Sequence, residues 1–548
     1  MNKISSLEGK FLIKEGKIID GTGNPWYRGD ILIENGKIKK ISHNISDKTT
    51  DRVINASNFI VSPGFIDIHT HSDLTVLFSR GENVISQGVT THVVGNCGFS
   101  MTPINPNRPK DDKASEQMKS MLSMMDTQFQ FNTLNEYLER LEKKGIPINL
   151  IPLIGHSTLR MYTLGLENRS PTENEMKEMK DILEEELKMG AFGMSTGLDY
   201  PPGSFAKTDE IIELCKVVKK YNGIYTTHFR GFPGGLVKAT KEAIKIAKTG
   251  ISVEINHFKP FGFWPGDIKK AYKHVEKARI SNLDVTFDVF PHASNSTFLF
   301  VLVPPWVYLS DNKINIPGAI ETLKKSKTDV SLKEKIYREI DLIGKSFLKI
   351  NDPRDWKKVY INAPGSKLYN GKTIYQNALE KEEDPRQIII DVLIEQGGSV
   401  NGTYLSMTEE ENIITITHPL TMFASDGRII PEDDPNYFPN PYANGCFTQV
   451  LGKYVREKKL LTLEDAIRRM TSYPAQKLGL KYRGLLREEN SADITIFDFK
   501  KIIDKATYEN PRLYSEGVEY VFINGVLALD GGVFTGSLSG QPICKNYI

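Results

Sequence analysis

The chain has 548 residues, and its 70 Lys and Arg nearly balance its 68 Asp and Glu, for a formal net charge of +2. This balance excludes the basic surface expected of a protein that binds nucleic acid or an anionic membrane. Hydrophobic residues make up 39% and charged residues 25%, as in ordinary globular proteins, which excludes a mostly disordered chain. No apolar run approaches the roughly 20 residues of a membrane helix, and the polar start lacks a signal-peptide core. We therefore expect a cytoplasmic protein without nucleic-acid or membrane partners.

The two chain ends are predicted to form one small β domain. Short strand-like segments occur near both ends, at residues 11–19, 30–33, 37–41, 492–497, 520–523 and 526–529. Asn35-Gly36 offers a hairpin turn between two of them. Neither end holds enough strands for a stable unit by itself. We therefore expect residues 1–62 and 483–548 to pair into a β-sandwich domain, with residues 63–482 inserted between them.

Residues 63–482 alternate short apolar strands with amphipathic helices. The predicted strands are 65–68, 91–94, 149–154, 191–194, 224–227, 252–255, 285–289 and 421–424. The predicted helices are 133–144, 172–189, 208–221, 235–248 and 267–280. Strands that alternate with helices favour a parallel sheet, and eight such units indicate an α/β fold of the (β/α)8 TIM-barrel type. A doubly wound sheet is the rival, but no Gly-x-Gly-x-x-Gly follows an early strand.

Two segments interrupt this alternation. Residues 101–131 are rich in Met and charged residues, and residues 293–417 form a long insertion before the eighth strand. Insertions after barrel strands commonly extend the catalytic face. A mobile lid or a contact in a homo-oligomer would explain them equally well, and the sequence does not separate these alternatives.

The strongest local motif is a His-x-His at the end of the first barrel strand. Residues i and i+2 of a strand point to the same side, so His69 and His71 can converge on one metal ion. Taken alone, such a motif also arises by chance in many chains. It therefore indicates a metal site only if other ligands lie nearby.

Further ligand types follow other predicted strands. Cys97, His228, His257 and Asp426 each lie just past the C-terminal end of a different strand, and in a parallel barrel these ends share one rim. Each has a simpler explanation: an inert buried thiol, a core histidine or a helix cap. Together they favour a metal site, because a thiolate with several imidazoles suits Zn(II), with Fe(II), Co(II) and Mn(II) as rivals.

The sequence resembles the amidohydrolase superfamily and, within it, the D-aminoacylase or N-acyl-D-amino-acid deacylase group. The resemblance covers nearly the whole chain. Its matching stretches are residues 63–73, 88–91, 95–98, 155–160, 195–203, 227–230, 255–259, 304–306, 425–427 and 451–457. The Cys in Gly95-Asn96-Cys97-Gly98 is specific to this group, since many other amidohydrolases bridge two metals through a carboxylated Lys.

The resemblance implies a role for each candidate ligand. One metal position would be faced by His69, His71 and Asp426, and a tighter one would be held by Cys97, His228 and His257. One or two zinc ions, or other divalent transition metals, are therefore expected. Zinc lowers the pKa of a bound water to about 7, so hydroxide is available to attack an amide carbonyl. Asp426 would take the water's proton and return it to the leaving nitrogen.

Substrate recognition departs from the family pattern. The Arg that clamps the substrate carboxylate in the family is replaced by Tyr442, and a Tyr after the seventh strand is replaced by His292. Lys259 and Arg428 remain as candidate carboxylate partners, and Tyr200 lies in the Tyr-Pro-Pro-Gly stretch expected to contact substrate.

Three functions follow from these observations. The first is hydrolysis of a small linear amide, most simply an N-acyl-D-amino acid. The second is opening of a cyclic amide or ureide, as in a dihydropyrimidinase-like enzyme, since such substrates lack a free carboxylate. The third is a non-catalytic scaffold, against which the complete set of ligands argues.

Overall fold

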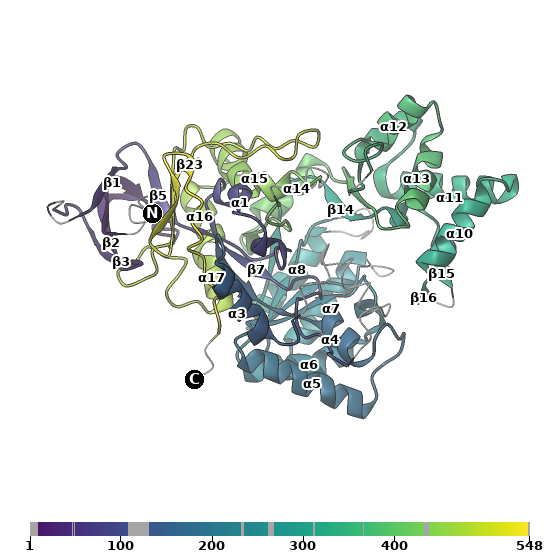
Figure 1. The fold of residues 1–548 in the computed structure, drawn as a ribbon, viewed down its shortest axis with the longest axis horizontal. Helices are drawn as coiled ribbons and strands as arrows, with labels where there is room; N and C mark the ends of the chain where they lie inside the picture. Colours follow the sequence, from purple (N-terminus) through teal and green to yellow (C-terminus); the bar gives the residue numbers. More distant parts are fainter. Residues whose placement is uncertain are drawn as a thin grey trace.

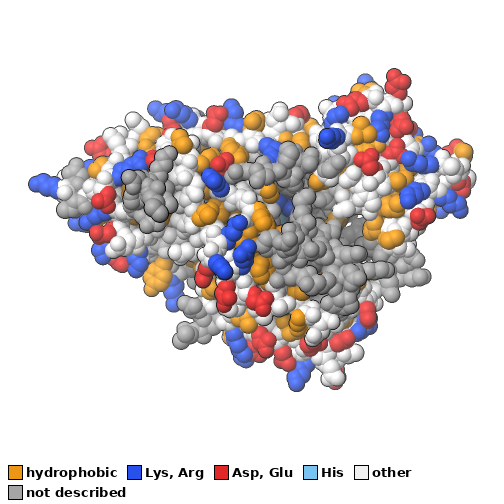
Figure 2. Space-filling model, viewed as in Figure 1, with side chains coloured by type: hydrophobic (Ala, Val, Ile, Leu, Met, Phe, Trp, Pro, Cys, Tyr) orange, Lys and Arg blue, Asp and Glu red, His pale blue; other side chains and the backbone are white. Residues whose placement is uncertain are grey.

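The structure is a computed structural model that describes residues 9–545 except 47, 49, 108–130, 232–234, 261–267, 311–312, 365 and 432–437. Three parts follow one another along its longest axis: a β-rich lobe, a central α/β body and a mainly helical lobe (Figure 1). Most of the interruption expected at residues 101–131 lies outside the described residues. Both positive and negative side chains occur across the visible face (Figure 2).

The β-rich lobe is built from both ends of the chain. Its strands are β1 (Phe11–Ile18), β2 (Tyr27–Glu34), β3 (Lys37–Ser42), β4 (Arg52–Asn55), β5 (Ile60–Pro63), β20 (Ile494–Phe497), β21 (Val518–Ile523), β22 (Val526–Asp530) and β23 (Val533–Phe534). They form a nine-stranded sheet of order β23-β22-β21-β20-β5-β1-β2-β3, with β4 paired to β1. The antiparallel β5–β20 pair joins the two chain ends. Phe11 on β1 and Phe522 on β21 are separated in the sheet by two strands, β5 and β20, yet their rings lie only 5.2 Å apart. The sheet therefore curls around a shared core.

The central body is a parallel barrel. Its strands are β6 (Phe65–Asp67), β7 (Val89–Val94), β8 (Asn149–Pro152), β9 (Ile154–Gly155), β10 (Gly193–Gly197), β11 (Ile224–His228), β12 (Ser252–Ile255), β13 (Val285–Val289) and β19 (Thr421–Phe423). Leu153 separates β8 from β9, so one predicted strand is two short ones. A bridge between Thr70 and Gly427 brings the segment after β6 beside the segment after β19 and closes the ring. The predicted (β/α)8 fold is confirmed.

Helices surround the barrel. They are α1 (Glu82–Ile85), α3 (Leu134–Lys144), α4 (His156–Thr163), α5 (Glu173–Lys188), α6 (Thr208–Lys220), α7 (Gly235–Ala247), α8 (Ile268–Ile280), α15 (Tyr442–Gln449), α16 (Leu463–Met470) and α17 (Ser472–Leu478), with the short 3-10 helices η2 (Thr75–Leu77) and η3 (Gly203–Phe205) and the π-helix η6 (Val450–Glu457). Helix α5 shows why these segments are helical. Thr172 and Glu175 form a capping box at its start, and Met179, Leu183 and Leu187 bury one face.

The insertion between β13 and β19 has a hydrophobic core of its own. Its elements are β14 (Asn295–Phe298), η4 (Leu299–Leu302), α9 (Pro305–Tyr308), β15 (Leu309–Ser310), β16 (Lys313–Ile314), α10 (Ile316–Ser326), α11 (Val330–Leu348), η5 (Pro353–Lys358), β17 (Val359–Asn362), α12 (Ile374–Lys381), α13 (Pro385–Glu395), β18 (Asn401–Tyr404) and α14 (Glu409–Thr417). Its three-stranded sheet has the order β14-β18-β17. Helices α10–α13 stand well apart from the barrel (Figure 1). No helix among the described residues is long and apolar enough to cross a membrane.

Candidate metal centre

The six candidate ligands gather at the C-terminal rim of the barrel. His69 and His71 follow β6, Cys97 follows β7, and Asp426 follows β19. The amide N–H of Asp426 donates to the carbonyl of His69 over 2.9 Å, and the N–H of His71 donates to the carbonyl of Gly427 over 2.8 Å. This backbone pairing fixes the His-x-His segment against the segment that carries Asp426.

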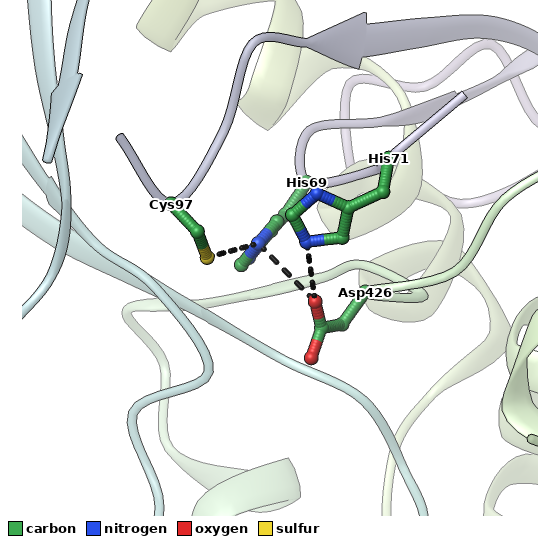
Figure 3. A group of neighbouring side chains, drawn as sticks. All are labelled: His69, His71, Cys97 and Asp426. Carbon is green, nitrogen blue, oxygen red and sulfur yellow. Dashed lines mark hydrogen bonds and ion pairs between the residues drawn. The ribbon is translucent and has the colours of Figure 1, made fainter. Parts of the chain in front are cut away.

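The first ligand group contains His69, His71, Cys97 and Asp426 (Figure 3). Oδ1 of Asp426 lies 3.1 Å from Nε2 of His71 and 3.3 Å from Nε2 of His69. Sγ of Cys97 lies 3.4 Å from the same Nε2 of His69. The four donor atoms therefore point toward one shared volume.

The second ligand group contains Cys97, His228 and His257. Sγ of Cys97 lies 3.8 Å from Nδ1 of His228 and 3.9 Å from Nε2 of His257. His228 is the last residue of β11, and His257 lies two residues beyond β12. Cys97 thus belongs to both groups, and its sulfur lies between them.

Three of the six candidates have a left-handed backbone. Their φ angles are 50° at Cys97, 35° at His257 and 49° at Asp426. Few residues other than Gly adopt this conformation, although Asn, Asp and His do so more often than the rest, and such strain concentrates at functional sites. Each of the three lies just past a strand end, where the reversed backbone directs the side chain into the rim instead of along the strand.

The charges at the rim suit a divalent cation. Burial by itself raises the pKa of the Cys97 thiol, but His69, His228 and His257 hold it well below its ordinary value. Burial also opposes ionisation of Asp426, yet the adjoining histidines lower the pKa of that carboxyl. A thiolate and a carboxylate therefore face a group of imidazoles.

The spacing of the donors also fits a metal ion. In a tetrahedral zinc site with bonds of about 2.0–2.3 Å, neighbouring donor atoms lie roughly 3.3–3.8 Å apart. The separations of 3.4–3.9 Å between Sγ of Cys97 and the three imidazole nitrogens are close to that range. The residues present therefore fit zinc or a similar divalent metal.

Two carboxylates that the motifs did not reveal lie behind the candidate ligands. Asp288 on β13 is buried, and its Oδ1 lies 3.3 Å from Nδ1 of His69. Asp199 lies after β10, with Oδ2 3.7 Å from Nε2 of His228. A signal for Asp288 was present, because it is the one charged residue in the buried strand Val285–Val289.

The predicted substrate residue Lys259 lies at the back of the rim. Its side chain is wholly buried, and Nζ donates to the carbonyls of Phe290 over 3.3 Å and His292 over 2.6 Å. Burial holds the pKa of Lys259 well below its ordinary value, whereas the charge of Asp426 opposes that decrease. These carbonyls take two of the three N–H donors that the group has in its charged ammonium form.

The other four predicted substrate residues are spread around the rim. Tyr442 is buried and stacks on Phe290 at 4.5 Å, and the buried ring of His292 lies 3.5 Å from a carboxylate oxygen of Asp504. Tyr200 is half-buried, with its ring 4.5 Å from that of His228. Arg428 is half-buried near Asp73: burial raises the pKa of Asp73 to about 6, although His71 and Arg428 both lower it.

His156, at the end of the third predicted strand, pairs with a carboxylate away from the two ligand groups. Glu210 on α6 accepts hydrogen bonds from Nη1 of Arg160 at 2.7 Å and lies 2.9 Å from Nε2 of His156. All three side chains are buried. Burial alone would raise the pKa of Glu210, but His156 and Arg160 lower it below its ordinary value. The cluster lies outside both ligand groups and joins α4 to α6.

We expect Glu210→Gln to lower the free energy of unfolding by about 3–5 kcal/mol at pH 7, because it leaves the Arg160 guanidinium buried without its counter-ion. The loss is measured by urea denaturation. Because the pKa of Glu210 is lowered in the folded state, its contribution is present above the carboxyl's unfolded pKa of about 4.3 and disappears as the pH falls through the folded value.

Glu213→Gln on the same helix is the matched control. Its carboxylate pairs with Lys180 and Lys216 at the surface, with 37% of its side chain exposed, so its loss should cost less than about 1 kcal/mol. Equal losses for the two variants would mean that the buried cluster contributes no more than a surface ion pair.

Known proteins resemble this chain along its whole length. The model of the amidohydrolase family matches residues 52–227 and 417–528. A D-aminoacylase from Alcaligenes xylosoxydans xylosoxydans is 30% identical over 552 residues, which cover 100% of this chain and 99% of the relative.

Solved structures extend the likeness to the fold. The N-acyl-D-glutamate deacylase of Bordetella bronchiseptica, complexed with zinc and a phosphonate mimic of the tetrahedral intermediate, has a TM-score of 0.78 at 29% identity and covers 98% of this chain and 100% of its own. A D-aminoacylase with a binuclear metal centre has a TM-score of 0.78 at 28% identity, over 98% of this chain and 99% of its own. A D-hydantoinase shares only the fold, with a TM-score of 0.56 at 13% identity. The chain belongs to the amidohydrolase family and, within it, to the group that contains D-aminoacylase.

Proposed function

We propose that this protein is a zinc-dependent hydrolase that deacylates N-acyl-D-amino acids. The observation that carries the proposal is the convergence of two ligand groups on the single sulfur of Cys97, with all donor atoms of each group within 4.8 Å of one another. The D-aminoacylase relative and the zinc-bound N-acyl-D-glutamate deacylase support the substrate class and the metal.

The ligand groups suggest how one or two ions would be held. Cys97, His228 and His257 would form the tighter site, since a thiolate and two imidazoles are the donors that zinc prefers. His69, His71 and Asp426 would form the second. A bound ion would polarise the amide carbonyl and lower the pKa of a water molecule, so that attack occurs at neutral pH.

Asp426 is suited to move the proton in this reaction. Burial alone would raise the pKa of the Asp426 carboxyl, but the neighbouring histidines lower it. Asp426 is therefore ionised and able to accept a proton. About 20% of its side chain is exposed, so it can reach a water molecule and the substrate. Asp426 would accept the proton of the attacking water and then deliver it to the leaving nitrogen, which leaves a carboxylate and an amine.

The two alternative functions have less support. The D-hydantoinase and the N-acyl-D-glutamate deacylase both cover 98% of this chain, but the hydantoinase is 13% identical and shares the fold alone, whereas the deacylase is 29% identical and has the higher TM-score. A non-catalytic scaffold has no use for six ligand residues placed within one rim. A linear N-acyl amide is therefore the substrate that we propose.

A substrate panel tests the proposal. Zinc-loaded protein is assayed with N-acetyl-D-amino acids, their L-enantiomers and cyclic ureides, with released amine or ring opening as the readout. We expect hydrolysis of the D-enantiomers and none of the ureides. Ring opening without deacylation would contradict the proposed substrate class, and inactivity toward every compound would contradict the proposed chemistry.

We expect Lys259→Met to raise KM for N-acyl-D-amino acids at least tenfold with a smaller change in kcat. Two N–H donors of Lys259 contact backbone carbonyls, and the third would bind the substrate carboxylate, which would also favour the charged ammonium. The measurement compares each acid with its neutral α-amide, which should be unaffected by the variant.

Lys245→Met on the exposed face of α7 serves as the control, because its ammonium pairs only with Asp209 at the surface in the described contacts. An unchanged KM for the free acids in Lys259→Met would show that their carboxylate is bound elsewhere.

A further inference from the structure

A single buried carboxylate touches both ligand groups of the metal centre. Asp288 is 1% exposed and lies on β13, beneath the rim. Its Oδ1 lies 3.3 Å from Nδ1 of His69 and accepts the backbone N–H of His257 over 2.7 Å. Its Oδ2 accepts the side-chain amide of Asn256 over 2.8 Å. Three donors from two different segments therefore meet on one side chain.

The contact with His69 fixes which ring nitrogen is free to bind metal. Both oxygens of Asp288 already accept an N–H donor, so Asp288 acts as an acceptor toward His69 as well, and the proton of the neutral imidazole lies on Nδ1, next to Asp288. The lone pair is then on Nε2, the atom that lies 3.4 Å from Sγ of Cys97 and 3.3 Å from Oδ1 of Asp426. Such partners commonly set the tautomer and orientation of metal-binding histidines.

The hydrogen bond between Asp288 and His257 holds the backbone of His257, not its ring. His257 has a φ of 35°, a conformation that a residue with a Cβ adopts only when its surroundings enforce it. Its N–H is buried and donates to Asp288, while the N–H of Asn256 donates to the carbonyl of Thr227 over 3.0 Å. With this turn held, Nε2 of His257 lies 3.9 Å from Sγ of Cys97.

We propose that Asp288 is a positioning residue that prepares both metal positions together, His69 through its tautomer and His257 through its backbone. This inference rests on the proposed metal centre. Asp199 offers a contrast, because its Oδ2 lies 3.7 Å from Nε2 of His228, a ligand of one group only. Loss of Asp288 should therefore weaken both metal positions, and loss of Asp199 only the one that contains His228.

The test measures zinc affinity on metal-free protein by competition with a chromophoric chelator, without any assay of turnover. Wild-type protein is compared with Asp288→Ala, Asp288→Asn and Asp199→Asn, and thermal unfolding of each metal-free variant shows that it is folded. We expect Asp288→Ala to weaken every resolved zinc-binding step by about 10–100-fold, the usual effect of removing such a partner. Asp199→Asn should weaken one step only.

A double variant that exchanges the side chains of Asp288 and Asn256 should rescue zinc affinity. Asp288→Asn keeps the shape of the side chain but brings its amide against the amide of Asn256, so zinc affinity should fall. Adding Asn256→Asp restores a donor–acceptor pair and turns the remaining oxygen back toward His69 and His257, so affinity should recover at least tenfold. If Asp288→Ala does not fold, this isosteric pair decides the question.

The outcomes separate this inference from the proposed function. Wild-type affinity in both Asp288→Ala and Asp288→Asn would overturn the role of Asp288 and leave the metal centre intact. Weakening of a single step by the Asp288 variants would overturn the coupling of the two positions. A wild-type protein that binds no zinc would overturn the proposed function and this inference together.

Discussion

Exchange of Asp426 for Asn is expected to lower kcat for amide hydrolysis by at least about 10²–10⁴-fold, the usual contribution of one general acid–base group. The expected loss is at the upper end because one carboxylate would serve both proton transfers. An amide at this position can neither accept the proton of the attacking water nor return it to the leaving nitrogen. The measurement is kcat with saturating N-acyl-D-amino acid and zinc.

The same variant should keep the tighter metal position. Cys97, His228 and His257 do not include Asp426, so elemental analysis should still find about one zinc per chain. Asp209→Asn, at an exposed side chain on α6, is the control for the change of Asp to Asn itself. A kcat near that of the wild type would reduce Asp426 to a structural residue at the end of β19.

Exchange of Cys97 for Ala is expected to remove most of the bound zinc from a folded protein. Its sulfur belongs to both ligand groups, so its loss leaves two imidazoles in one group and removes the shared donor from the other. Removal of the thiolate also removes the negative charge that the three neighbouring histidines stabilise. Zinc per chain is measured after dialysis against a weak chelator.

Cys215→Ala is a closely matched control. Cys215 is also a free, buried thiol, but it lies on α6 in the hydrophobic core of the barrel, and burial raises the pKa of its thiol. That variant should keep its zinc and lose some stability, because a buried group leaves a cavity. Full zinc retention in Cys97→Ala would remove Cys97 from the metal centre.

The barrel could be predicted from the sequence because its strands are short apolar runs between amphipathic helices. β12 and β13 lie at the predicted residues, and α5 differs by one residue at each end. The internal structure of residues 293–417 could not be predicted in the same way. Its small antiparallel sheet pairs β14 with β18, strands about a hundred residues apart, and local patterns do not specify such pairing.

The candidate ligands could be predicted because strand ends of a parallel barrel meet at one rim. The directions of their side chains could not be predicted, because they depend on left-handed backbone conformations at Cys97, His257 and Asp426. No local sequence pattern indicates these conformations. Asp288 was missed because it is not part of a ligand motif. Its role depends on contacts with His69 and Asn256, which lie on other strands or follow them.

The substrate-binding roles stay predictions, and the surroundings of these residues could not be predicted from the sequence. The position of Lys259 two residues past His257 suggested an extended chain, whereas the chain leaves the extended conformation at His257. Its ammonium consequently reaches the carbonyls of Phe290 and His292. Burial of Tyr442 against Phe290 likewise depends on the packing of α15 on the barrel, which the sequence does not reveal.

The most direct test of a zinc-dependent deacylase is a titration of metal-free protein with zinc while the initial rate of N-acyl-D-amino-acid hydrolysis is followed. We expect a rate near background without metal and a rise to its maximum within the first one or two equivalents. The L-enantiomer should remain unreactive throughout the titration. Full hydrolysis by the metal-free protein, or no hydrolysis at any zinc ratio, would contradict the assignment.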